Sequence, residues 1–144
     1  MGNVTLRSTK GSPLTSNEMD ANFNFLDTNK APLTLSITAA VTLGGNRVVI
    51  MTPTGCQYAD KDTPSHIGKV VGVTTQAVTS GGVANVMSSG TLNGFSGLVT
   101  GTTYYLGTNG NIVTSVSTGI SQQIGVAYSS DTLIISLSQP ILIE

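Results

Sequence analysis

The second half of the chain carries almost no charge, and this limits what it can fold into and bind. Between Lys69 and Glu144 the only charged side chain is that of Asp131, and the other polar residues are serine, threonine, asparagine and glutamine. A stretch this neutral cannot hold a nucleic-acid backbone by neutralising its phosphates. It is also poor in the titratable groups that acid–base catalysis and metal binding use. The composition therefore favours a structural role over a chemical one.

The chain has the length of one domain with an appendage, at 144 residues. Charged residues make up 9% of it, against about 25% in an average domain, so we expect a surface built largely of hydroxyl and amide groups. Hydrophobic residues make up 39%, which argues against disorder because disordered chains combine charge with low hydrophobicity. The net charge of -1 provides little repulsion between copies, which suits assembly.

No segment predicts secretion or membrane insertion. Arg7 and Lys10 are followed by polar residues, whereas a signal peptide continues with an apolar core. No apolar run approaches the ~20 residues of a membrane-spanning helix. The single cysteine, Cys56, excludes a disulfide within the chain and is predicted to be a small buried apolar residue.

Residues 1–32 form a predicted N-terminal arm with a short helix at about 15–28. The helix begins with a capping box, in which the Thr15 hydroxyl faces the Glu18 amide and the Glu18 carboxylate reaches back. One apolar face follows from the spacing of Met19, Phe23 and Leu26. A helix of about three turns does not form alone in water, so this face must dock. We leave open whether it meets this chain's own β domain, a sister subunit or a larger assembly.

From residue 33 to residue 144 the pattern predicts a mainly β domain. Apolar and polar residues alternate over 33–38, which predicts a strand with one buried face. Further strands are predicted at 47–51, 67–75, 83–87, 103–106, 112–116, 123–128 and 132–137. Residues 44–46 predict a hairpin turn, Asn109-Gly110 predicts another, and residues 52–65 predict a long loop. This spacing of strands and turns indicates an antiparallel β-sandwich or a small barrel.

The predicted loop and its end hold the residues best suited to chemistry. Asp60, Asp62 and His66 have side chains that bind divalent metals, and Ser65 beside His66 offers the residue types of a hydrolase site. Neighbours in sequence do not make a catalytic triad, which is defined by geometry. A solvated loop with Asx turns is the favoured interpretation. We therefore predict no catalytic, cofactor or metal site and no enzymatic activity.

Tyr104 and Tyr105 form the best aromatic pair. Adjacent residues of a strand point to opposite faces, so we expect one tyrosine in the core and the other at the surface. An exposed tyrosine can stack on a sugar or fill a subunit interface. Ordinary packing is the favoured alternative, and the pair is kept as a candidate glycan contact.

The N-terminal segment resembles the start of many tail fibres and related appendages of tailed bacteriophages. The likeness runs through residues 6–15 (Leu-Arg-Ser-Thr-Lys-Gly-Ser-Pro-Leu-Thr), Glu18, residues 20–23 (Asp-Ala-Asn-Phe) and Leu26. It implies that this segment anchors the protein to a particle or forms a subunit interface. The candidate residues for that role are Leu6, Arg7, Lys10, Pro13, Leu14, Met19, Phe23 and Leu26.

The C-terminal part is similar to a β module that recurs near the ends of phage fibre and capsid-decoration proteins. The similarity lies in residues 97–106 (Gly-Leu-Val-Thr-Gly-Thr-Thr-Tyr-Tyr-Leu), residues 123–127 (Gln-Ile-Gly-Val-Ala) and the apolar run at 140–143. The chain has no long shaft between its two ends, which favours a head fibre, a capsid-decoration protein or a tail adaptor over a long fibre.

The two resemblances together imply a virion protein assembled in the cytoplasm of the host bacterium. Its expected partners are further copies of itself, in a homotrimer, and phage capsid or tail proteins. No nucleic acid, membrane or cofactor is expected. The alternative is a tail fibre or adaptor that binds a carbohydrate receptor on the host.

Overall fold

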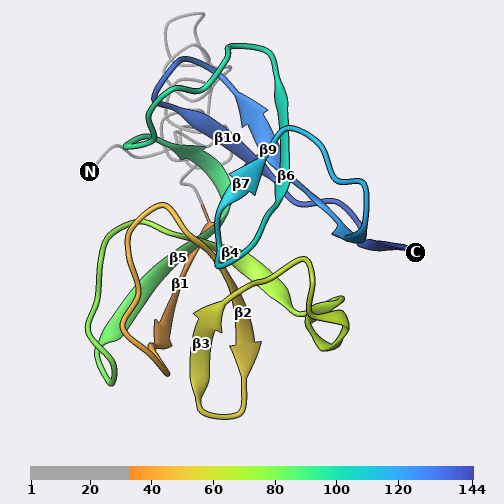
Figure 1. Ribbon diagram of the computed structural model, residues 1–144. Helices are drawn as coiled ribbons and strands as arrows, with labels where there is room; N and C mark the ends of the chain where they lie inside the picture. Colours follow the sequence, from red (N-terminus) through yellow and green to blue (C-terminus); the bar gives the residue numbers. More distant parts are fainter. Residues whose placement is uncertain (1–32) are drawn as a thin grey trace, which may run out of the picture. The chain divides into compact units, whose positions relative to one another are not determined.

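The computed structural model describes residues 33–144 (Figure 1). The predicted helix at 15–28 and all eight candidate anchoring residues lie outside this range. Within it the fold is mainly β and antiparallel, as the sequence predicted. The elements of its first half are β1 (Leu33–Thr38), β2 (Val48–Thr52), β3 (Gly55–Tyr58), the 3-10 helix η1 (Pro64–His66), β4 (Val70–Thr74) and β5 (Val83–Leu92). Those of its second half are β6 (Thr103–Leu106), β7 (Ile112–Val113), β8 (Gly119–Ser121), β9 (Gln123–Ala127), β10 (Leu133–Ser136) and β11 (Ile141–Ile143).

Nine of these strands form one curled antiparallel sheet, a half-barrel. The strand order is β3-β2-β4-β5-β10-β9-β6-β7, and β1 also pairs with β5. β8 and β11 form a separate two-stranded sheet. The long strand β5 joins two groups of strands, because β1 and β4 pair with its first part and β10 pairs with residues 89–92 (Figure 1).

Two apolar cores lie on opposite faces of β2, β4 and β5. Successive side chains of a strand point to opposite faces, so Val48 and Ile50 enter one core while Val49 enters the other. The main core contains Val48, Ile50, Ala59, Val73, Met87, Leu92, Leu98, Tyr104, Leu106, Ile120, Ile124, Ala127, Leu133 and Ile135. The small core contains Ile37, Ala39, Leu43, Val49, Cys56, Ala84 and Val86.

β1 confirms the predicted strand at 33–38, but its apolar face is only partly covered. Ile37 is buried in the small core, whereas Leu33 is 57% exposed and Leu35 is 38% exposed. The end of β1 approaches β3 through a bridge between Ala39 and Cys56, and no described residue covers the beginning of the strand to the same extent.

Two predictions in the first half of the domain were wrong. Residues 52–65 are not one long loop, because β3 lies within them and pairs with β2 across a tight turn at Pro53 and Thr54. Gly55, which suggested a loop, instead has φ +133 and a position where a Cβ atom would contact the carbonyl oxygen of Thr38. The turn at 44–46 does precede β2, but it does not join a hairpin, because β1 pairs with β5 and β2 pairs with β3 and β4.

The predictions for the second half hold more closely. The turn at Asn109 and Gly110 joins β6 to β7 as a hairpin. Both residues have positive φ angles, 51 and 72, as the tight turns favoured in hairpins require. The strands expected at 103–106, 123–128 and 132–137 correspond to β6, β9 and β10. The short strands β8 and β11 were not predicted.

Candidate functional site

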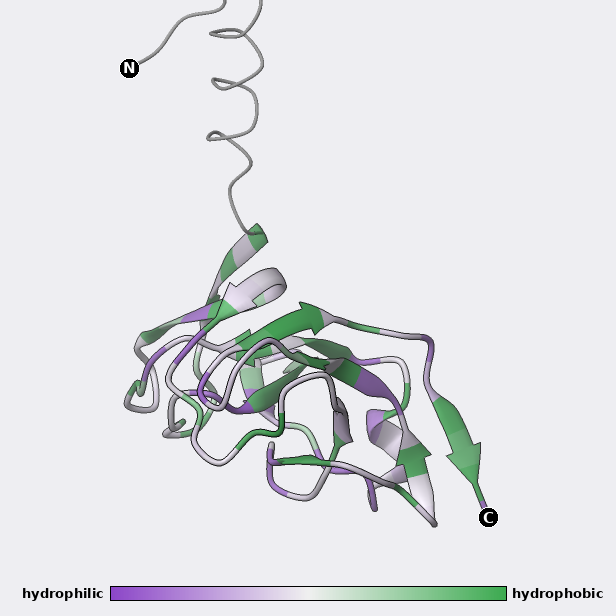
Figure 2. Ribbon diagram, turned by 90° about the horizontal axis from the view of Figure 1, so that it is seen from above, coloured by the Kyte–Doolittle hydropathy of each residue, from purple (hydrophilic) through white to green (hydrophobic). Residues whose placement is uncertain are grey.

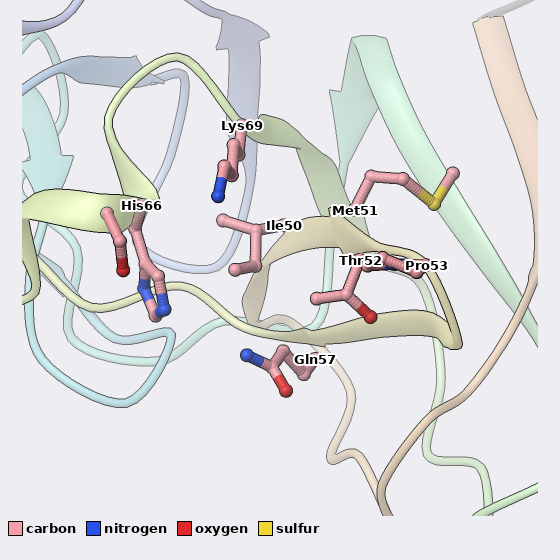
Figure 3. Close-up of a pocket in the computed structure, with 8 residues that line it drawn as sticks. Ile50, Met51, Thr52, Pro53, Gln57, His66 and Lys69 are labelled. Carbon is pink, nitrogen blue, oxygen red and sulfur yellow. The ribbon is translucent and has the colours of Figure 1, made fainter.

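A cavity of about 550 Å³ opens beside the β2–β3 hairpin (Figure 3). Its wall comes from the hairpin, from η1 and from the segment that leads into β4. The residues that line it are Ile50, Met51, Thr52, Pro53, Gln57, Ser65, His66 and Lys69. Lys69 and Gln57 lie on two sides of Ile50, and His66 lies across from them (Figure 3).

Backbone hydrogen bonds fix the segment that carries His66 and Lys69. Pro64 begins the 3-10 turn, where its fixed φ is suited to the first position. The amide of Lys69 donates to the carbonyl of His66 at 3.1 Å, and the amide of Met51 on β2 donates to the carbonyl of Lys69 at 3.1 Å. These bonds connect the segment that carries His66 and Lys69 to the hairpin that forms the other side of the cavity.

The side chain of His66 is held in one orientation. Its Nδ1 accepts a hydrogen bond from the amide of Asp60 at 3.0 Å. An acceptor Nδ1 places the proton of the neutral ring on Nε2. The ring therefore presents an N–H donor at Nε2.

Asp60 and Asp62 do not join His66 in a metal site. The Asp60 carboxylate accepts the amide of Asp62 at 2.9 Å, which is an Asx turn, and the amide of Asn109 at 3.2 Å. Asp62 pairs with Lys61. Across residues 33–144, no group of three or more histidine, cysteine or acidic side chains could hold a metal ion. Asp60 ties the loop to the β6–β7 turn.

The two candidate glycan-contact tyrosines have different environments. Tyr104 is buried in the main core, and its hydroxyl accepts the amide of Val99 at 3.0 Å. Tyr105 points to the other face and is half-buried. Tyr128, which follows β9 and was not singled out from the sequence, is 67% exposed. Its exposure could have been predicted from its place beside the Ser129–Asp131 turn, because strand ends at turns tend to be solvent-accessible.

Cys56 is completely buried in the small core, as predicted. Burial raises the pKa of its thiol, since desolvation penalises the thiolate, and a backbone hydrogen bond opposes this to a smaller extent. A thiol kept in its neutral form is a poor nucleophile. The geometry is that of a packing residue.

An exposed apolar surface lies on β11. Ile141 is 65% exposed and Leu142 is 45% exposed, although the two side chains point to opposite faces of the strand. β11 pairs on one side with β8, and it stands out as a strongly hydrophobic strand in Figure 2. We refer to Ile141–Ile143 as the apolar edge.

No protein-family model matches the chain, and neither a curated protein nor a solved structure matches it. Among the residues that the structure describes, no helix has the length and hydropathy needed to cross a bilayer.

Proposed function

We propose that this protein is a non-enzymatic structural component of a bacteriophage virion, a head fibre or capsid-decoration protein. In this proposal residues 1–32 attach the protein to the particle, and the β domain associates as a homotrimer. The support is the resemblance of the two ends of the chain to phage appendage proteins, together with the nearly uncharged β body.

The observation that carries the proposal is the apolar edge. Strands at the edge of a sheet invite pairing with another chain, and soluble monomers usually protect them with charges, proline or a covering element. Pro140 and Glu144 flank β11, yet Ile141 and Leu142 remain exposed and no described element covers them. Neighbouring copies would cover both faces of β11. The sequence suggested a complete sandwich or barrel. We propose that the half-barrel is completed in this way when copies of the protein assemble.

The test is the oligomeric state of the purified protein. Sedimentation velocity at micromolar concentration should give a trimer for the natural chain and a monomer for the double variant Ile141→Lys, Leu142→Lys. Val99→Lys is the control, because Val99 is 62% exposed and does not belong to β11. The proposal would be contradicted if the natural chain is monomeric and absent from purified virions.

The position on the virion is tested by electron microscopy with a gold-labelled antibody to the β domain. Label over the capsid supports the head-fibre or decoration role. Label over the tail favours a fibre or adaptor.

The second candidate function is carbohydrate binding by a tail fibre or adaptor. It is favoured by the exposure of Tyr128 and the partial exposure of Tyr105, since tyrosine rings at a surface are suited to packing against sugars. Binding to host cells should fall in Tyr105→Ala and Tyr128→Ala, and should persist in Tyr104→Phe, which keeps the buried ring. Cell binding that none of these changes affects would count against this function.

A further inference from the structure

The cavity beside the β2–β3 hairpin contains polar groups that no described residue engages. Within residues 33–144, no hydrogen bond or ion pair engages the Gln57 amide, the Ser65 hydroxyl, Nε2 of His66 or Nζ of Lys69. A second hollow, of about 280 Å³, differs in this respect. There Arg47 donates to Asn111, and the Asn46 amide donates to the carbonyl of Asn93. Unused donors therefore distinguish the first cavity.

We propose that this cavity binds a small ligand bearing one carboxylate or phosphate group. Lys69 supplies the positive charge, and Nε2–H of His66 and the Gln57 amide supply directed donors. Hydrogen bonds from a charged donor to an anion are shorter and stronger than neutral ones. Met51 and Pro53, which line the cavity and are exposed, provide apolar surface for the rest of the ligand. The cavity has the volume typical of small-molecule sites, about 300–1,000 Å³.

Local electrostatics favour an anion at this position. The nearby carboxylates, Asp60 and Asp62, do not line the cavity. Asp60 accepts two backbone amides, and Asp62 is paired with Lys61. From Val70 onward the β domain adds only Asp131 and Glu144 as charged side chains. Lys69 is therefore a positive charge with no ion-pair partner among the described residues.

The His66 ring and the backbone of Lys69 are also positioned before any ligand arrives. His66 is oriented through Nδ1, and the backbone of Lys69 is fixed at both its amide and its carbonyl. Binding to a preformed site loses less conformational entropy than binding that must order a loop. This inference is independent of the proposed function, since an appendage of any location can carry such a site.

The test uses three sugars that differ in one substituent: glucuronate, glucose 6-phosphate and glucose. Each is titrated into the ¹⁵N-labelled full chain while amide chemical shifts are followed. We expect the two anionic sugars to shift the amides of residues 50–57 and 65–69, and glucose to leave them unchanged. Response to one anion alone supports the proposal and identifies the preferred group. Response to neither anion, or an equal response to glucose, overturns it.

Two matched lysine variants separate the cavity from general charge. Lys69→Gln should weaken binding by about tenfold, because a hydrogen bond to a charged group is lost. Lys61→Gln removes the same charge from the same loop, but Lys61 is paired with Asp62 and does not line the cavity, so its affinity should match that of the natural chain. Equal affinities of the two variants would overturn the assignment of Lys69. The amide spectrum of each variant shows whether it is folded.

Discussion

The main core and the small core share three strands but differ in how completely they are enclosed. The main core gathers side chains from strands on both sides of β5, including Leu106 on β6 and Ile124 on β9. The small core has half as many buried residues, and alanines and a cysteine are among them. At its margin Leu33 and Leu35 remain exposed. Because stabilisation follows the apolar area removed from water, the main core should hold the domain together and the small core should open first.

The shared strands explain why the two cores still fold together. Val48 and Val49 are both completely buried, one in each core. A strand buried on both faces needs a nearly continuous apolar sequence, and the run at 48–50 provides it. A substitution in β2 therefore affects both cores. A substitution in another element can affect one core without the other.

Replacing a leucine in either core should reduce the stability of the domain more than any other change considered. Leu106 lies in the main core and Leu43 lies in the small core, and both are almost fully buried. Leu106→Ala and Leu43→Ala should each reduce the free energy of unfolding by about 2–5 kcal/mol. Leu43→Ala should fall at the lower end, because the less enclosed core can relax around the lost side chain. Urea denaturation measures both, with Val99→Ala as a surface control. A larger loss for Leu43→Ala would contradict the ranking of the two cores.

An intermediate effect is expected for the reactivity of Cys56. Its raised pKa and complete burial should keep the native thiol unreactive toward an aromatic disulfide reagent at neutral pH. Labelling then requires the small core to open, and local opening can be easier than global unfolding. Both variants should be labelled faster under native conditions than the natural chain. For the same loss of global stability, the increase in labelling rate should be larger for Leu43→Ala than for Leu106→Ala. Labelling rates that follow global stability alone would show that the two cores open as one unit.

The smallest effect concerns Asp131 in the β9–β10 turn, on the side of the main core. Hydrogen bonds from the hydroxyls of Ser129 and Thr132 lower the pKa of its carboxyl group. A lowered pKa in the folded state means that the stabilisation is present above the unfolded pKa and is lost as the pH falls through the folded pKa. Asp131→Asn should therefore flatten the dependence of thermal stability on acidic pH by a small amount, since the group is fully exposed. An unchanged acid profile would show that these bonds do not favour the charged form.

Only part of the candidate site could be predicted from the sequence. His66 was singled out there as a candidate metal ligand or hydrolase residue, and within residues 33–144 no metal-binding group forms around it. Gln57 and Lys69 were not noticed, because no local motif links them. They meet His66 only because β3 pairs with β2 and the chain before β4 bonds to Met51. In the same way, the split between Tyr104 and Tyr105 followed from strand alternation, while the exposure of Tyr128 depended on how β9 ends.

The class of this domain and many of its local elements follow from the sequence alone. Short-range geometry was sufficient for these, as at Asn109-Gly110, where positive φ angles specify the turn, and at β1, where the alternation of residues 33–38 specifies the strand. The predicted helix at 15–28 lies outside the described residues and stays a prediction. The pairing of β1 with β5, the burial of β2 on both faces and the existence of β3 depend on the packing of the whole domain. A period of two shows that a strand has two different faces, but the partner of each face lies far away in the sequence and is chosen by packing.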